Sequence, residues 1–460
     1  MINKKEILRR RDMRAPLTFT IDPADAKDFD DALSYEPLPD GNLQIGVHIA
    51  DVTWYVHPDD KTDKAAYERG TSIYLVDKVL PMLPEELCND RCSLRPGEDK
   101  LCMSVIFTMS DTAEVVKHKI CRTVIRSDFR LNYGEAQAYI DGAAPKPGQE
   151  QLRDTILALN RLALILRKQR MQAGALDLEA DEIKFRLDKD GRPTDIYFEH
   201  PSEANHLIEE FMLLANRTVA EQLGKTGKQS VWRIHDKPDT EKLEAIDHFK
   251  RRMGDNIPAS TLYLLTVRAM AKAVYSTHNI GHYGLAFDHY THFTSPIRRY
   301  PDMMVHRLVS RYLLGERRTD MSTDLQEACE HCSECEQQAA EAERDSVKYM
   351  QAIWMQDHQD EVFSGIISGV KEFGVFVTLD ESRCDGLIPI KTLCPGYLFD
   401  LDEKNFCLRT AGRIKRRGRT TQEDAEEEQQ RVFMLGDQVK VRVTHIDADK
   451  RQITFELAES

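Results

Sequence analysis

The chain has 460 residues, of which 41% are hydrophobic and 30% are charged, and its formal net charge is −14 at pH 7. This length predicts two or three domains, and no apolar run approaches the length of a membrane span. The acidic balance argues against a protein that coats nucleic acid non-specifically. It is compatible with a nucleic-acid enzyme whose basic residues line one channel.

The cysteines and the N-terminal residues indicate the compartment. Ten cysteines are scattered along the chain without the compact framework of a disulfide-rich secreted domain. The first residues, MINKKEILRRRDMR, are charged and lack the apolar core of a secretory signal. We therefore expect a cytoplasmic protein that has no membrane partner.

The N-terminal part predicts a sheet. The expected elements are a helix at 4–13, a strand at 17–21, and strands at 31–38 and 42–52 that pair through the turn Pro39-Asp40-Gly41. The motif HIADV places His48 and Asp51 at a strand end, where a satisfied structural pair is favoured over a catalytic one. The aspartates that precede this hairpin are expected at the mouth of the sheet.

The segment TIDPADAKDFDDAL, residues 20–33, holds five aspartates. Asp28, Asp30 and Asp31 fall within four positions, and Asp22 ends the strand before them. A cluster of like charges needs a cation to offset its repulsion, and hard carboxylate oxygens suit Mg²⁺, with Mn²⁺ as the alternative. The competing interpretation is an acidic surface turn.

The middle of the chain predicts more strands and several helices. The strands are expected at 72–83 and 101–109, and the helices at 151–172, 204–223 and 262–277. Cys88 and Cys92 are spaced like zinc ligands, but no second pair follows, so zinc is not favoured. In the helix at 204–223, Glu209 and Glu210 flank the apolar stripe, and periodicity leaves open which of them points into a site.

A loop rich in His, Tyr and Phe follows, ending in HFTSPIRRYPDMMVHR. It is expected to deliver Arg298 and Arg299 to the start of a proline-containing helix, where an arginine can grip a phosphate with two hydrogen bonds. A structural salt bridge is the alternative. The helix expected at 324–358 carries Cys329, Cys332 and Cys335, which favour a buried thiol-lined face over a metal site.

The last hundred residues read as short strands separated by glycines and turns, which predicts a small all-β barrel. Phe373 and Phe376 offer aromatic faces for base stacking, with core packing as the alternative. The run at 413–431 is basic, then acidic, and nearly without apolar residues, so it predicts a disordered excursion.

An ordered series of motifs resembles the RNB catalytic domain of the RNase II and RNase R exoribonucleases. The motifs are the aspartate segment, HIADV, MLPEELCNDRCSLRPG, GALDL, LIEEFMLLAN, HFTSPIRRYPDMMVHR and AERD. They span roughly residues 10–350, and their residues resemble RNase R more than RNase II. The C-terminal barrel resembles the OB-fold RNA-binding domain of the ribosomal S-one type that follows RNB in these enzymes.

The resemblance implies an α+β fold, with a mixed sheet surrounded by helices over 1–355 and a small OB-fold barrel over 356–460. It implies 3′-to-5′ hydrolysis of single-stranded RNA to nucleoside 5′-monophosphates with Mg²⁺, in RNA degradation. We expect a monomer with no dinucleotide cofactor. The resemblance makes Asp30 and Arg298 catalytic, with Arg298 on the scissile phosphate. It makes Asp22, Asp28 and Asp31 metal ligands, which Asp30 completes through a second metal or by orienting the nucleophilic water.

The resemblance also assigns RNA contacts. Tyr74 corresponds to the residue that stacks on the 3′-terminal base, and Tyr133 and Glu209 to residues that read the ribose 2′-hydroxyl. Leu178 stands where the family has Phe in GALDF, and leucine offers no π face for stacking. Glu343, in AERD, corresponds to a residue that lines the site.

Two departures from the family are visible. Family members carry cold-shock-type domains before RNB, whereas this chain begins almost at RNB, which leaves a truncated chain, a fragmentary gene and a naturally minimal form open. The region 247–261 is shorter than usual. The alternative functions are a non-catalytic RNA-binding protein, which the retained aspartates and Arg298 oppose, and a DNA phosphodiesterase, which Tyr133 and Glu209 oppose.

Overall fold

A seven-stranded mixed sheet forms the centre of the N-terminal part of the computed structural model, which describes residues 4–177, 181–253, 259–316, 324–413 and 431–458. Its strands are β1 (Arg11–Asp12), β2 (Leu17–Asp22), β3 (Asp31–Pro37), β4 (Leu43–Ala50), β7 (Asp99–Met109), β8 (Val115–Arg126) and β9 (Phe129–Asn132). They lie in the order β1-β8-β7-β4-β3-β2-β9. β1 pairs with β8 and β2 with β9 in parallel, and the other neighbours are antiparallel.

One face of this sheet is apolar. Alternate residues of a strand point to the same face, so apolar residues at every second position gather there. In β4, Ile45, Val47 and Ile49 are fully buried. Helices α4 (Glu150–Gln172) and α5 (Glu203–Lys225) contribute to the same core and pack against each other. Shorter helices α2 (Lys61–Arg69) and α3 (Tyr133–Ile140) and the buried helix α8 (Tyr300–Tyr312) complete this part.

His48 and Asp51 are both structural, but each pairs with other residues. The ring nitrogens of His48 lie 2.8 Å from the hydroxyls of Ser104 and Ser34 on the neighbouring strands. The Asp51 carboxylate forms ion pairs of 2.7 Å with Arg10 and with Arg122. Asp51 therefore ties the N-terminal segment to the sheet.

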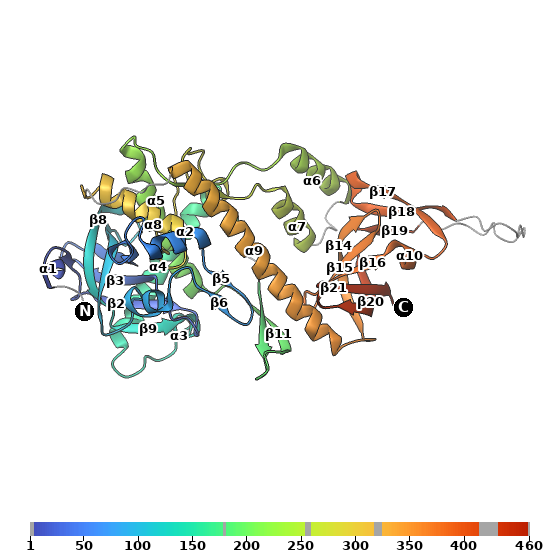
Figure 1. Cartoon of the computed structure of the whole chain (residues 1–460), viewed down its shortest axis with the longest axis horizontal. Helices are drawn as coiled ribbons and strands as arrows, with labels where there is room; N and C mark the ends of the chain where they lie inside the picture. The colour runs from blue at the N-terminus through green and yellow to red at the C-terminus, as the bar shows by residue number, and fades with distance from the viewer. Residues whose placement is uncertain (1–3, 178–180, 254–258, 317–323, 414–430, 459–460) are drawn as a thin grey trace, which may run out of the picture.

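The long helix α9 (Leu325–Gln356) runs from the N-terminal part to the C-terminal barrel (Figure 1). Ala328, Cys329 and Cys332 lie in the main core, whereas Cys335, the third cysteine of the predicted buried face, is only half-buried. Ala352 and Met355 lie in the core of the barrel. One rigid element therefore shares residues with both cores.

The C-terminal part is a closed five-stranded barrel in the order β14-β15-β16-β21-β20. Its strands are β14 (Val362–Lys371), β15 (Gly374–Leu379), β16 (Asp385–Pro389), β20 (Gln438–Asp447) and β21 (Gln452–Leu457), with the short helix α10 (Ile390–Leu393) after β16. A separate sheet holds β17 (Tyr397–Asp402), β18 (Cys407–Arg413) and β19 (Val432–Met434). The predicted α+β class with a terminal OB-fold barrel is confirmed. Of the run predicted to be disordered, residues 414–430 lie outside the described residues.

Two further segments pack against the C-terminal part. Helices α6 (Thr240–Met253) and α7 (Ala259–Ala269) pack on the separate sheet, where the rings of Phe249 and Phe406 meet edge to face at 5.5 Å. A hairpin of β10 (Glu182–Leu187) and β11 (Pro193–Glu199) packs Ile196 against the barrel core. The barrel thus contacts the rest of the chain through more than its linker.

Three predicted elements end differently in the structure. The helix expected at 4–13 is α1 (Lys4–Ile7), followed by β1. The helix expected at 262–277 stops at Ala269, and β13 (Val274–Ser276) pairs with β12 (Trp232–Ile234). The strand expected at 72–83 is a hairpin of β5 (Ile73–Tyr74) and β6 (Val79–Leu80). In the first two cases a strand partner distant in sequence ends the helix, which local periodicity does not report.

Every helix in the described ranges is too short or too polar to cross a bilayer.

The docking of α6 and α7 predicts a stability effect. Phe249 is 1% exposed, so Phe249→Ala removes a ring that fills the contact with the separate sheet and is expected to cost about 3–5 kcal/mol. Thermal unfolding should then show the barrel melting at a lower temperature than the main core. Val267→Ala on α7, where Val267 is 41% exposed, is the matched control. An F249A chain that melts like the unmodified one would contradict this docking role.

Candidate active site

The aspartates lie where the sheet opens. β2 and β3 pair only from Leu17↔Tyr35 to Phe19↔Leu33, so the two strands separate before Asp22 and Asp31. Beyond that point β2 continues alongside β9, with Asp22 opposite Asn132. The loop 23–30 fills the opening and carries Asp28 and Asp30. Asp22 and Asp30 are buried, whereas Asp28 and Asp31 are half-buried.

Asp30 and Arg298 meet across 267 intervening residues of chain. One Asp30 carboxylate oxygen accepts the Ile297 amide at 2.8 Å, and the other lies 3.9 Å from Arg298 Nε. The Arg298 side chain is 42% exposed and also donates to Ser295 Oγ at 3.1 Å. Arg298 is therefore fixed by its backbone while its guanidinium still faces solvent, as a ligand for an incoming anion should.

The neighbouring arginine has a different role. Arg299 precedes α8 and forms a 2.9 Å ion pair with Asp302, which is fully buried. The Arg298 carbonyl accepts from the Ser72 amide at 2.9 Å and from Thr71 Oγ1 at 3.1 Å. The loop before α8 is thus clamped on both sides, with Arg299 turned into the protein and Arg298 toward the aspartates.

The carboxylates lack compensation. Burial raises the pKa of Asp22, Asp28, Asp30 and Asp31, and the Asp31 charge raises that of Asp22 further. Arg298 opposes the rise in pKa at Asp28, Asp30 and Asp31. One buried oxygen of Asp22, Oδ2, has no hydrogen-bond partner among the described residues. Arg299 also opposes the rise in pKa at Asp31 and Arg130 that at Asp22, yet the pKa of all four carboxyls stays raised, so the site fits a bound cation.

The geometry limits how such a cation would be held. Within the described ranges, no three His, Cys, Asp or Glu side chains converge closely enough to form a metal site unaided. A hard divalent ion that keeps several waters and takes further oxygens from a phosphate suits one or two carboxylates. The assignment of Asp22, Asp28 and Asp31 as ligands stays a prediction.

Two tyrosines flank the cluster. Tyr133 follows β9 directly, and burial together with the Asp31 and Asp22 charges raises the pKa of its hydroxyl. Tyr74 is 41% exposed on β5, and burial with the Asp28 and Asp30 charges raises its pKa, which Arg298 opposes. The Tyr74 amide donates to Glu343 Oε1 at 2.8 Å, so α9 supports this residue. The two tyrosines therefore lie within electrostatic reach of the aspartates, and Glu343 joins the group through the Tyr74 amide.

Three other predicted residues form no hydrogen bond or ion pair with the aspartates or the two tyrosines among the described residues. Glu209 is exposed on α5 and lies 3.3 Å from Arg170, whereas Glu210 is buried and pairs with the same arginine at 2.6 Å. Phe373 and Phe376 lie on the barrel, with ring centroids 6.0 Å apart, and Phe373 is 55% exposed. Leu178 lies outside the described residues.

The sequence pattern does not mark two residues that hold the aspartate loop. Ser93 Oγ accepts the Phe29 amide at 3.0 Å, and Arg130 Nη2 donates to the carbonyls of Pro23 and Ala24 at 2.7 and 2.9 Å. Neither belongs to a cluster of chemically reactive residue types. The position of Ser93 within the quoted motif MLPEELCNDRCSLRPG is the one signal that could have found it.

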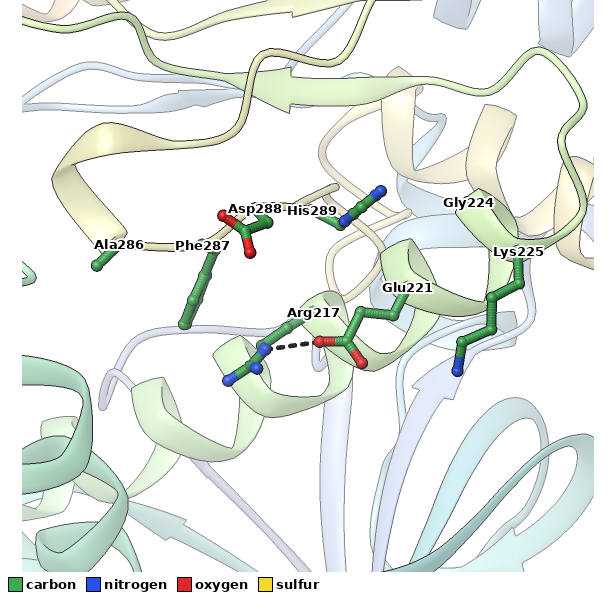
Figure 2. A pocket seen from close by; sticks show the side chains of 8 residues that line it. All are labelled: Arg217, Glu221, Gly224, Lys225, Ala286, Phe287, Asp288 and His289. Atoms are coloured by element: carbon green, nitrogen blue, oxygen red, sulfur yellow. Dashed lines mark hydrogen bonds and ion pairs between the residues drawn. The ribbon is translucent and has the colours of Figure 1, made fainter. Parts of the chain in front are cut away.

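A cavity of 410 Å³ lies elsewhere, between the C-terminal half of α5 and residues 286–289 (Figure 2). Arg217 pairs with Glu221 at 2.8 Å there and lies over the Phe287 ring. Its lining shares no residue with the aspartate group, so it is not part of the candidate site.

The fold and this site define the class of protein. Residues 10–315 match the RNB domain, and residues 356–457 match the S1 RNA binding domain. The chain therefore belongs to the RNB family, which confirms the resemblance seen in its sequence. Membership of this family implies a requirement for a divalent metal ion.

Within the family, the chain is similar to ribonuclease R. It is 40% identical to Ribonuclease R of Aquifex aeolicus (strain VF5) and 38% identical to that of Thermotoga maritima, in both cases over 100% of this chain and 66% of the relative. The chain thus spans slightly less than two thirds of these relatives. The solved structure of Mycoplasma genitalium RNase R in complex with ribose methylated single-stranded RNA matches with a TM-score of 0.90 at 26% identity, covering 100% of this chain and 73% of that one.

The uncompensated charge predicts a pH-dependent stability. A carboxyl whose pKa is raised on folding favours the folded chain when protonated, so stability falls as pH rises above the unfolded value of about 4. With a chelator present, Asp22→Asn should weaken this loss of stability with rising pH. It should raise the apparent Tm at pH 7–8 by roughly 2–4 °C per kcal/mol of relieved repulsion. With a divalent ion added, the unmodified chain should gain more than the variant. Asp25→Asn, at an exposed aspartate of the same loop, is the control.

Proposed function

We propose that the chain is a metal-dependent 3′-to-5′ exoribonuclease that hydrolyses single-stranded RNA to nucleoside 5′-monophosphates. The observation that carries this proposal is the meeting of Asp30 with Arg298 beside three more carboxylates. A protein that only binds RNA has no need of a dense acidic cluster next to a cationic phosphate ligand. Similarity to ribonuclease R, over less than two thirds of its length, supports the same conclusion.

We propose the following roles for the chain's own residues. Arg298 grips the scissile phosphate through its exposed guanidinium, and Asp22, Asp28 and Asp31 hold Mg²⁺, with Mn²⁺ as the alternative. When bound, the ion lowers the pKa of a water and stabilises charge on the phosphoryl oxygens. Asp30 completes the site, and the Ile297 amide keeps its carboxylate oriented.

We propose RNA contacts for the remaining predicted site residues. Tyr74 supplies a stacking face for the terminal base, and Tyr133 supplies a hydroxyl beside Asp31 for the ribose 2′-hydroxyl. Glu209 is proposed as its partner in reading that hydroxyl, and Leu178 and Glu343 as further contacts. Phe373 and Phe376 present aromatic faces on the barrel, which we propose holds the upstream strand.

The organisation proposed for the chain is a catalytic domain at 1–355 and an RNA-binding barrel at 356–460. The boundary falls at the end of α9, where Met355 already packs in the barrel core. A cytoplasmic monomer without a dinucleotide cofactor remains our expectation. The RNA-bound state of the Mycoplasma genitalium relative supports single-stranded RNA as the substrate class.

Stepwise degradation tests the activity. A 5′-labelled single-stranded RNA with Mg²⁺ should yield a ladder of shortening products. Asp30→Asn should lower the rate by more than ~10²-fold while RNA affinity changes little, because the carboxylate acts on the reacting centre. Asp25→Asn is the matched control. If the folded, metal-loaded chain binds RNA but leaves it intact, the non-catalytic RNA-binding alternative holds instead.

Sugar selectivity tests the substrate class. An all-ribo oligonucleotide should be degraded, and an all-deoxy one of the same sequence should be degraded much more slowly. Tyr133→Phe should reduce this discrimination by up to ~10-fold, the worth of one hydrogen bond, while degradation of the deoxy strand stays the same. Equal rates on both substrates would support the DNA phosphodiesterase alternative.

A further inference from the structure

The loop that carries the acids has little structure of its own. Residues 23–30 form no regular helix or strand, and the internal backbone hydrogen bond joins the Ala26 amide to the Pro23 carbonyl at 3.1 Å. Asp22 and Asp31 belong to strands at either end, whereas Asp28 and Asp30 depend on the loop. What holds the loop therefore decides how the four carboxylates lie relative to one another.

The C-terminal half of the loop is anchored by one serine. Ser93 Oγ accepts the Phe29 amide at 3.0 Å and donates to the Lys27 carbonyl at 2.8 Å, so it brackets Asp28. The Leu94 amide donates to the Phe29 carbonyl at 3.0 Å. The backbone on both sides of Asp28 is thus held in place.

The N-terminal half is anchored by one arginine. Arg130 Nη2 donates to the carbonyls of Pro23 at 2.7 Å and of Ala24 at 2.9 Å. The same guanidinium lies over the ring of Phe29, 5.4 Å from its centroid. Arg130 therefore touches both halves of the loop.

The sheet register puts Arg130 in the right place. β9 runs parallel to β2, with Thr20 opposite Arg130 and Asp22 opposite Asn132. Paired residues point to the same face, so Arg130 lies on the face of Asp22 and is half-buried. Its charge also opposes the rise that burial causes in the pKa of Asp22. A planar guanidinium can donate in its plane and stack on a ring at once, which lysine cannot do.

We propose that Arg130 is a positioning residue for the cation site: by holding the Pro23 and Ala24 carbonyls and the Phe29 ring together, it sets the spacing of Asp22, Asp28 and Asp30 and hence the affinity for a divalent ion. The inference rests on the metal site of the proposed function. It adds a residue that acts on the metal without belonging to its ligands.

Direct metal binding tests this role without relying on activity. Mn²⁺ is titrated into the full chain in the absence of RNA, by calorimetry or by electron paramagnetic resonance. Arg130→Lys should bind Mn²⁺ about 10-fold more weakly, and Arg130→Met more weakly still, the range that residues behind metal ligands usually show. The far-UV circular dichroism spectrum and apparent Tm should stay close to those of the unmodified chain. If the chain is active, a higher Mg²⁺ concentration should restore its rate.

Two variants control the result. Arg126→Lys changes another arginine of the same sheet, which is 52% exposed and pairs with Asp99 at 2.6 Å, and it should leave Mn²⁺ affinity unchanged. Ser93→Ala removes the opposite anchor and should weaken Mn²⁺ binding in the same direction as Arg130→Lys.

The outcomes separate this inference from the proposed function. Mn²⁺ binding that weakens in R130K supports the inference even if the chain degrades no RNA. Unchanged Mn²⁺ affinity in a folded R130K overturns it even if the chain is an active nuclease. Weaker RNA affinity with unchanged Mn²⁺ affinity also overturns it, because Arg130 would then be a direct RNA contact. An unmodified chain that binds no Mn²⁺ overturns it too, since Arg130 would then have no cation site to position.

Discussion

Four carboxylates concentrated at one end of a sheet are the constraint on which the rest of this structure depends. Burial raises the pKa of each member of the group, and neighbouring carboxylates raise it further at Asp22, Asp28 and Asp30. They stay close together because the backbone fixes where each one lies. Asp22 and Asp31 end and begin buried strands, and Asp30 is fixed by the Ile297 amide. The carboxylates therefore lower the stability of the folded chain, and the surrounding core offsets this loss.

The arginine that faces the acids derives its position from a buried helix. Residues 300–310 of α8 are all buried, and Arg307 within it forms a 2.6 Å ion pair with Asp63 of α2. The segment just after α2 in turn holds the Arg298 carbonyl through Thr71 and Ser72. Arg298 can therefore stay exposed and still be placed accurately, because its backbone is held from both sides.

The barrel is attached to the rest of the chain at several points. α9 shares its residues with both cores, the α6 and α7 pair packs on the separate sheet, and the β10–β11 hairpin packs on the barrel core. The barrel is thus joined to the part of the chain that carries the aspartates by several packed contacts besides its linker.

The sequence by itself predicted the family and the strongly periodic elements. The acidic cluster, the β3–β4 hairpin, helix α5 and the terminal barrel all have local signals, and the ordered motifs identified the family. Only the tertiary structure decided that Arg299 pairs with the buried Asp302, that Asp51 pairs with Arg10 and Arg122, that α7 stops where β13 begins, and that Arg130 holds the aspartate loop. The physical reason is common to these cases. Periodicity and turn chemistry report the backbone preferences of neighbouring residues, whereas the direction of a side chain at a loop or strand end is set by partners that lie far away in the chain.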